Sequence, residues 1–348
     1  MKYLTHYDNF VHYIDFKKLL KEFDNKNFTF FNTNAHAFFI QNQKHISDLF
    51  KDYEYNGEYI FIMLAFEMHV ASKSDPQIIE QMFKKDIDLD KVYVITNNHT
   101  FAKNSHLKHI HFEFFEYAIQ QCNLEQPHYD KCKNNIIVDV NKKRHDKKFL
   151  CLNGRPKYFR RTLTDFFIDN DLIKDSSYSF RDKDITLTYD NKFNDYYYDD
   201  DQVSMKKWKT KDLNVNLVFD NEFSYENSIY VVTECYFDDD LENCYITEKT
   251  YKAMLWKMPF IIVGQPHILK VLKKLGYKTF NHMWDEDYDS IINPHDRMRK
   301  IQQLILNLSK RDLKKLISEN YEILEHNYNN LMSRRPEKEL LDTMRSLS

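Results

Sequence analysis

The sequence predicts an α/β protein with two mostly parallel, doubly wound sheets and a C-terminal helical tail. Its 348 residues correspond to about two domains, since a domain usually has roughly 100–200 residues. Short apolar segments alternate with helical patterns in both halves of the chain, as is typical of parallel sheets with crossover helices. We expect an N-terminal α/β domain at 1–140, a second α/β domain at 141–330 and a tail at 331–348.

Four apolar segments in the first half are expected to be strands. Each is short and rich in β-branched or aromatic residues, and helical patterns occur between them, for example at 10–23 and 76–85. Parallel strands need such long crossover connections. The predicted strands are Phe28–Asn32, Tyr59–Leu64, Val92–Thr96 and Ile110–Phe115.

The region from 122 to 148 differs in composition and is expected to connect the two domains. It contains Pro127, several asparagines and the basic run Lys142–Arg144. Its one apolar segment, Ile136–Val140, is expected to form a single strand.

The second half repeats the alternation of strands and helices. Ser309 and Asp312 have the spacing of a capping box for the last helix. The predicted strands are Lys148–Leu152, Ile229–Cys235, Pro259–Val263 and Tyr277–Phe280, and the predicted helices are Tyr158–Asn170, Thr247–Trp256, Pro266–Leu275, Asp296–Leu308 and Lys310–Asn330.

The bulk composition argues against several classes of protein. A net charge of −3 does not favour binding to bulk nucleic acid. The longest apolar runs, Ile60–Phe66 and Pro259–Val263, are shorter than the ~20 residues of a membrane span, and no signal peptide is visible. Five cysteines without a CxxC pair are expected to be reduced thiols. We therefore expect a cytoplasmic protein with no membrane partner.

The segment Cys151–Arg161 concentrates positive charge where a helix is expected to begin. Arg155, Lys157, Arg160 and Arg161 follow a predicted buried strand. Because the helix dipole is already positive at this end, cations there are normally disfavoured unless an anion lies between them. Phosphate binding is the hypothesis, with Arg160 as the first candidate. A solvated basic helix face is the alternative.

The segment from 244 to 264 has a similar arrangement. Thr247 is a good N-cap, so Glu248 and Lys249 fall in the first helical turn. The dipole favours Glu248 there, whereas Lys249 again suits a bound anion. Gly264 permits close backbone approach at the end of the next strand. The chain lacks both GxGxxG and GxxxxGK[ST], which argues against dinucleotide-binding and P-loop motifs.

A third segment, 272–289, carries Gly276 as a helix C′ residue and then an acidic aromatic loop at 284–288. A packed structural loop is the favoured interpretation. Contact with a sugar or a base is the alternative.

These motifs together resemble viral and bacterial glycosyltransferases of the α-1,3-fucosyltransferase and exostosin type. The similar segments read TEKTYKAMLWKMPFIIVG, LKKLGYKTF and WDEDYD, and FLCLNGRPKYFRRTLTDFF with a later YSF resembles the LNRRPR segment of such proteins. The resemblance covers 149–289, about 40% of the chain. The first half resembles no family that we can name.

The resemblance implies a GT-B-like fold of two facing Rossmann-like domains, with a nucleoside-diphosphate sugar bound by the C-terminal one. It implies that Glu248 contacts the ribose, that Lys249 contacts the diphosphate and that Arg155 or Arg160 adds a second phosphate contact. It also implies a metal-independent reaction without a further cofactor and a hydroxyl acceptor, for example a glycan. Gly154 stands where related sequences often carry arginine, which leaves the choice of arginine open.

An inverting transfer needs a base near the acceptor hydroxyl. Glu67 follows the strand predicted at Tyr59–Leu64, at the end of a parallel strand where such sites form, and His69 and His36 are alternatives. Glu234, at the end of another predicted strand, is expected either to bind the donor sugar or to cap a neighbouring helix.

Three other functions stay open. Asp199–Asp201 and Asp238–Asp240 could form the metal site of a GT-A transferase, although acidic runs are usually solvated. The basic run at 142–144 is compatible with a viral enzyme that glycosylates nucleic-acid bases, and the few glycines and many Lys, Asn and Ile residues suggest an AT-rich genome, viral or bacterial. A non-catalytic nucleotide-binding protein is the third possibility.

Overall fold

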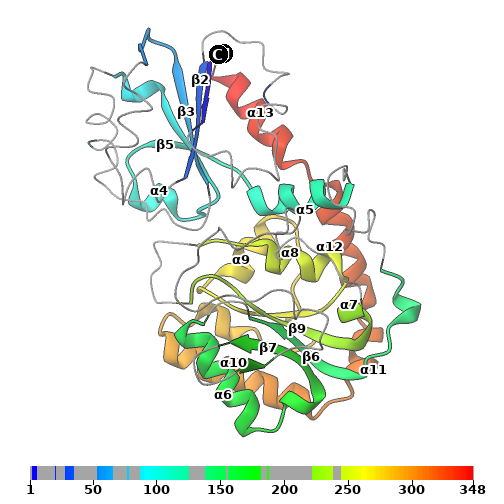
Figure 1. The fold of residues 1–348 in the computed structure, drawn as a ribbon. Helices are drawn as coiled ribbons and strands as arrows, with labels where there is room; N and C mark the ends of the chain where they lie inside the picture. Colours follow the sequence, from blue (N-terminus) through cyan, green and yellow to red (C-terminus); the bar gives the residue numbers. More distant parts are fainter. Residues whose placement is uncertain are drawn as a thin grey trace. The chain divides into compact units, whose positions relative to one another are not determined.

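Parallel strands form two separate sheets in the computed structural model of the chain (Figure 1). The structure describes residues 2–5, 20, 28–34, 53–65, 77, 87–124, 138–153, 156–181, 186–187, 222–237 and 244–347. The first unit comprises Met1–Gln121, Asp240–Tyr245 and Arg334–Ser348, and the second comprises Cys122–Asp239 and Ile246–Ser333. The boundary therefore lies near 121 rather than at the expected 140.

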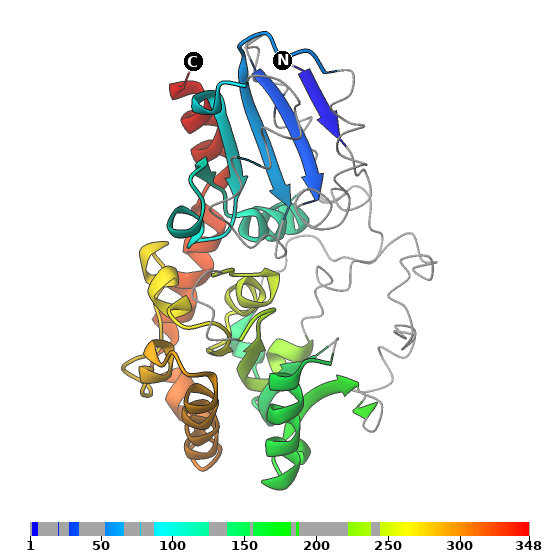
Figure 2. The same ribbon diagram turned by 90° about the vertical axis from the view of Figure 1, so that its left-hand side faces the viewer.

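The first sheet has five parallel strands, seen side by side in Figure 2. Its order follows the chain without a reversal, so these strands are not doubly wound, contrary to expectation. A sheet of this kind has no switch point of strand order at which a ligand would be expected. The strands are β1 Lys2–Thr5, β2 Phe28–Asn34, β3 Tyr59–Ala65, β4 Val92–Thr96 and β5 Lys108–His111.

Large apolar side chains on alternate positions of these strands form the core of the first unit. Phe28 and Phe61 are both buried, with ring centroids 5.1 Å apart. Helix α5 (Phe114–Leu124) adds Tyr117 and Ala118 to the same core. The short helix α4 (Phe101–Asn104) lies between β4 and β5.

The end of the chain returns to the first unit as helix α13 (Pro336–Ser346) and is not a separate tail. Leu340, Leu341 and Met344 lie on one face of this helix and are buried in the core of the first sheet. The Arg334 guanidinium pairs with the fully buried Glu116 carboxylate of α5 at 2.9 Å. The expectation of a separate tail at 331–348 is thus corrected. The apolar residues of this segment have the spacing of a helix and pack into the core of the first unit.

The second sheet contains four parallel strands and a short antiparallel edge strand, in the order β10-β9-β6-β7-β8. From β6 the chain first builds outward through β7 and β8, and it then crosses to the other side of β6 to add β9 and β10. The order reverses between β6 and β9, which makes this sheet Rossmann-like. The strands are β6 Lys147–Leu152, β7 Ser176–Arg181, β8 Thr186–Leu187, β9 Asn227–Thr233 and β10 Phe260–Val263.

Helices cover both faces of the second sheet. Figure 1 shows α8 and α12 on one side of its strands and α6 and α10 on the other. Right-handed crossovers explain why helices lie on both faces. The sheet grows in one direction from β6 to β7 and in the other direction from β9 to β10, so the crossover helices of the two parts fall on opposite faces. The helices are α6 Tyr158–Asp169, α7 Glu222–Glu226, α8 Glu248–Leu255, α9 Ile268–Lys274, α10 Pro294–Ser309, α11 Leu313–Ser318 and α12 Tyr321–Ser333.

Most predicted elements of the described residues are present, with four corrections. The fourth strand occupies Lys108–His111, and Phe114 and Phe115 begin α5 instead. Val138 to Val140 is not a strand, because a 3-10 turn starts at Val140. The helix expected over 310–330 is two helices, since α11 ends at Ser318 and α12 begins at Tyr321. Asp312 itself is the N-cap of α11, and its carboxylate accepts a hydrogen bond from Lys315 N at 3.0 Å.

The fourth correction concerns Tyr277–Phe280, which is not a strand and pairs with none of the strands among the described residues. The side-chain amide of Asn327 accepts from Lys278 N at 2.8 Å and donates to Lys278 O at 2.9 Å. Glu286 accepts from Phe280 N at 2.6 Å. Side chains therefore take the place of a neighbouring strand for this backbone.

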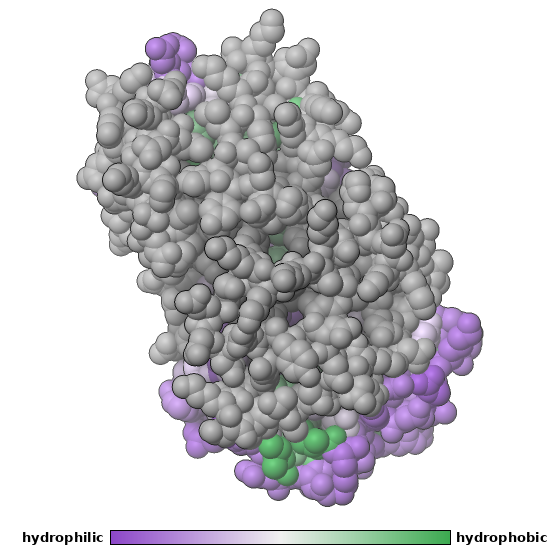
Figure 3. Space-filling model, in the orientation of Figure 1, coloured by the Kyte–Doolittle hydropathy of each residue, from purple (hydrophilic) through white to green (hydrophobic). Residues whose placement is uncertain are grey.

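On the face drawn in Figure 3, most of the described surface is hydrophilic, and the largest hydrophobic area lies near its lower edge. Within the described ranges, the exposed large hydrophobic side chains are Tyr158, Ile168 and Ile292. No helix that the structure describes combines the length and the apolar character needed to cross a lipid bilayer.

Candidate functional site

The candidate site lies where β9 ends, at the switch point of the second sheet. Thr233 is the last residue of β9, and Glu234 and Cys235 follow it. Helix α6 begins after the neighbouring strand β6, and α8 begins later in the chain. Ligands of open α/β sheets bind outside the carboxyl ends of strands at such a switch point, so these residues hold the expected position.

Arg160 is buried on the inner side of α6, with 4% of its surface exposed. Its Nη2 donates hydrogen bonds to Thr233 O at 3.2 Å and to Glu234 O at 3.1 Å. These contacts fix the backbone at the end of β9. Arg160 therefore supports the site by holding the backbone at the end of β9, and the phosphate contact expected of it stays a prediction.

Lys157 brings its ammonium group to the same place from the start of α6. It is the N-cap residue of α6, a position at which side chains that accept hydrogen bonds are preferred. Its Nζ donates to the carbonyl of Cys235 and lies 5.2 Å from the ring centroid of Tyr236. A lysine at this N-cap adds charge to the positive end of the helix rather than capping it.

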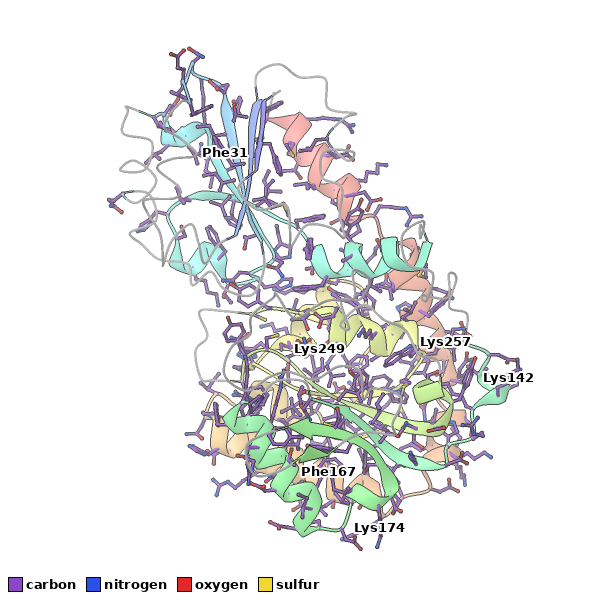
Figure 4. All side chains as sticks on the ribbon, viewed as in Figure 1. Phe31, Lys142, Phe167, Lys174, Lys249 and Lys257 are labelled. Carbon is purple, nitrogen blue, oxygen red and sulfur yellow. The ribbon has the colours of Figure 1, made fainter. Side chains whose placement is uncertain are left out.

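Lys249 brings a second ammonium group from the first turn of α8 (Figure 4). Its Nζ lies 2.7 Å from Glu248 Oε1, 3.2 Å from Thr247 Oγ1 and 3.6 Å from Cys235 Sγ. The side chain is 20% exposed. Lys157 and Lys249 therefore meet at one residue, Cys235, although 92 positions separate them in the sequence.

Thr247 is the N-cap of α8, as predicted, and its hydroxyl accepts from Lys249 N. The carboxylate of Glu234 accepts from Thr247 N at 3.1 Å, from Thr247 Oγ1 at 2.5 Å and from Thr250 Oγ1 at 2.6 Å. Of the two roles expected for Glu234, helix capping is the one that these contacts bear out. Burial raises the pKa of Glu234, and the Lys249 charge and the threonine hydrogen bonds partly offset the rise.

We expect Glu234→Gln to destabilise the second unit without weakening nucleotide binding. The amide nitrogen cannot accept the bond from one of the threonine hydroxyls, and a buried unmade hydrogen bond costs about 1–3 kcal/mol. Urea unfolding measures the free energy of unfolding, and calorimetric titration with nucleotides measures the binding affinity. A large loss of affinity at unchanged stability would mean that Glu234 binds ligand.

Glu248 is 2% exposed and forms an ion pair with Lys249. Burial alone would raise the pKa of Glu248, but the charges of Lys249 and Lys252 outweigh it and lower this pKa. The start of α8 therefore carries a hydrogen-bond acceptor, the ionised Glu248 carboxylate, and donors, the ammonium groups of Lys249 and Lys252.

Gly264 lets β10 end close to the site, as predicted. A Cβ atom there would lie 2.6 Å from Ile268 Cδ1 and 3.3 Å from Glu234 Cβ. The Gly264 carbonyl accepts from Arg297 Nε at 3.1 Å. Arg297 is 1% exposed and was not expected at this place.

The acidic aromatic loop after α9 is a packed structural element. Trp284 and Tyr288 are 6% and 2% exposed, and Glu286 accepts from Thr279 Oγ1 at 2.7 Å. The structural interpretation of this loop is confirmed. Gly276 has φ +84°, which fits its expected place after α9.

The basic run at 142–144 is engaged within the second unit. Lys143 Nζ donates to the carbonyls of Trp256 and Lys257 at the end of α8, at 3.3 and 2.9 Å. Arg144 pairs with Asp146 and Glu226 at 3.0 and 3.1 Å. Two of its three cations thus hold the unit together.

Several predicted site residues lie outside the described residues. They are Arg155 with Gly154, the base candidates Glu67, His69 and His36, and the acidic runs Asp199–Asp201 and Asp238–Asp240. Their predicted roles stay predictions.

Comparison with known proteins found no match among family models, curated proteins or solved structures. The fold and the site define the chain as an α/β protein whose second unit is Rossmann-like, with cations gathered at its switch point.

Proposed function

We propose that the chain is a glycosyltransferase of the GT-B type, which moves a sugar from a nucleoside diphosphate to a hydroxyl acceptor. The second unit holds the donor and the first unit holds the acceptor, for example a glycan. Cys151, Cys235 and Cys244 carry thiols rather than disulfides, which fits a cytoplasmic protein.

The convergence of Lys157 and Lys249 on Cys235 carries this proposal. Two ammonium groups and the starts of two helices meet at the switch point of a Rossmann-like sheet. Each of these features stabilises an anion. Together they suit a diphosphate, which carries two or more negative charges.

The donor would enter by replacing the long contact between Lys249 and Cys235. The contact of its Nζ with Cys235 Sγ is 3.6 Å long, and a phosphate oxygen is a much stronger acceptor than a thiol. The Glu248 carboxylate lies beside Lys249 and can accept hydrogen bonds from ribose hydroxyls. As the bond to the sugar breaks, charge builds up on the diphosphate, and the fixed ammonium groups stabilise it without a metal ion.

Acceptor activation is assigned to the first unit. Glu67 remains the first candidate for the general base, with His69 and His36 as alternatives. A base withdraws the proton of the acceptor hydroxyl while its oxygen attacks the anomeric carbon and the diphosphate leaves.

Thermal-shift screening of the full chain with GDP, UDP, CDP and TDP tests the donor site. A nucleotide that binds the folded state raises the melting temperature in proportion to ln(1 + [L]/Kd). We expect one base to be preferred and its effect to persist in EDTA. No shift with any nucleotide would contradict the proposal, and a shift that requires manganese would favour a GT-A enzyme instead.

Hydrolysis of the sugar nucleotide with the preferred base then separates an enzyme from a binding protein. We expect slow release of the sugar without an acceptor, because water can replace the acceptor hydroxyl. Tight nucleotide binding without any hydrolysis or transfer would identify a non-catalytic protein. A gel shift with duplex DNA over a salt series tests the nucleic-acid alternative.

A further inference from the structure

Two histidines and a glutamate meet at the carboxyl ends of β4 and β5 in the first unit. His99 follows β4, His111 is the last residue of β5, and Glu113 precedes α5. Thr96 of β4 is paired with His111 of β5, so the two strand ends are direct neighbours.

The three side chains point at one centre. Glu113 Oε1 lies 2.7 Å from His111 Nε2 and 3.0 Å from His99 Nε2. One ligand atom from each residue lies within 4.8 Å of the other two, and the imidazole centroids are 4.2 Å apart. The side-chain exposure rises from 4% at Glu113 to 13% at His99 and 32% at His111, so the cluster is buried on one side and accessible on the other.

Hydrogen bonds of the backbone and of Asn98 fix the segments that carry the two histidines, and these bonds do not use the imidazole rings. His99 N donates to Cys244 O at 3.0 Å. The side chain of Asn98 accepts from Cys244 N at 3.2 Å and from Thr100 N at 3.0 Å, which fixes the loop on both sides of His99. On the other strand, Phe112 N donates to Thr96 O at 2.9 Å, directly after His111. Such a fixed backbone lowers the entropy cost of binding a ligand between the side chains.

Imidazole nitrogen and carboxylate oxygen form the ligand set that zinc prefers. Two histidines and one glutamate are the protein ligands of a type of zinc site that keeps a fourth position open. Zinc bonds of about 2.0–2.1 Å place tetrahedral ligand atoms about 3.3 Å apart. The observed separations of 2.7 and 3.0 Å from Glu113 Oε1 need to widen by only about half an ångström.

We infer that His99, His111 and Glu113 bind a divalent transition-metal ion of the zinc type. The accessible side at His111 leaves the fourth position to water or to a small ligand. Magnesium and calcium do not fit, because they prefer oxygen ligands. The site belongs to the first unit, and the inference is independent of the donor site proposed for the second.

Zinc titration of the metal-free full chain tests this site in the absence of any nucleotide. A chromophoric chelator competes for Zn²⁺ and reports stoichiometry and affinity. We expect one tight equivalent in the unchanged protein, and we expect the double variant His99→Ala/His111→Ala to lose it. Glu113→Gln should weaken binding by at least about 10–100-fold, the loss that second-shell changes already cause. Magnesium in excess should not compete.

His106→Ala is the matched control, since it removes an exposed imidazole from the same unit and should leave the titration unchanged. His111→Ala alone provides the test if the double variant does not fold by circular dichroism. A cobalt-loaded protein should show the intense visible bands of four-coordinate Co²⁺, and these bands should be lost in the variants. Absence of a tight equivalent, or an equivalent that survives the loss of both histidines, would overturn the site.

Discussion

Combined substitution of Lys157→Ala and Lys249→Ala is expected to abolish measurable binding of nucleoside diphosphates. Each ammonium group should contribute one charge-assisted hydrogen bond of about 1.5–3 kcal/mol, or about 10- to 100-fold in affinity. Because both groups meet at Cys235, one diphosphate can contact both. Calorimetric titration with the nucleotide preferred in the thermal-shift screen measures the loss for each lysine and for the pair.

Lys274→Ala is the matched control for this experiment. Lys274 is an exposed lysine of α9 in the same unit, so its removal changes the net charge equally without touching the site. We expect its nucleotide affinity to equal that of the unchanged protein. Equal affinity in the Lys249→Ala variant would contradict the donor site, provided that circular dichroism shows the same fold.

Arg297→Ala is expected to cause the largest loss of stability in the second unit, about 4 kcal/mol or more. The guanidinium donates to Gly264 O at 3.1 Å, to Ile291 O and Ile292 O at 2.7 Å each, and to Phe237 O. It also packs 4.5 Å from the ring centroid of Phe237. Truncation leaves buried carbonyls without a donor and opens a cavity, and both effects are large in protein interiors.

Arg299→Ala provides the comparison, because Arg299 lies two residues away on α10 and is exposed. Its loss should cost less than about 0.5 kcal/mol. Arg297→Lys should rescue little, since one ammonium group cannot reach carbonyls in several directions. Hydrogen exchange of β10 and α10 reports the stability of this region. Equal exchange in both alanine variants would contradict the role given to Arg297.

The strands of both sheets were largely predictable, because strands of a parallel sheet are covered on both faces and therefore read as short, nearly continuous apolar runs. Val92–Thr96 is a strand with the predicted bounds, and Thr247 caps α8 as its side chain suggests. Strand β7 was missed, although Ser177, Ser179 and their aromatic neighbours alternate with the period of two typical of strands.

The role of Arg160 was not predicted, but its spacing contained a signal. Phe159, Leu163 and Phe167 recur at helical spacing and form the buried face of α6, and Arg160 adjoins that face. Lys157 is the N-cap residue before the first turn and therefore lies outside this face. Helical periodicity thus separates the buried arginine from the lysine that reaches the end of β9.

The cluster at His99, His111 and Glu113 could not be read from the sequence. Its residues come from two strand ends, and only the parallel pairing of β4 with β5 brings them together. Their spacing along the chain matches no metal motif in the first half. Arg297 was missed for a similar reason, since two of its carbonyl partners, Phe237 and Gly264, are distant in sequence.

Hydrogen exchange of the full chain, with and without the preferred nucleoside diphosphate, tests the location of the donor site most directly. The account predicts slower exchange at the starts of α6 and α8, in 156–161 and 247–252, since Lys157 and Lys249 would contact the diphosphate and its binding would restrain both helix starts. Protection confined to other parts of the chain, with these two helix starts unchanged, would contradict it.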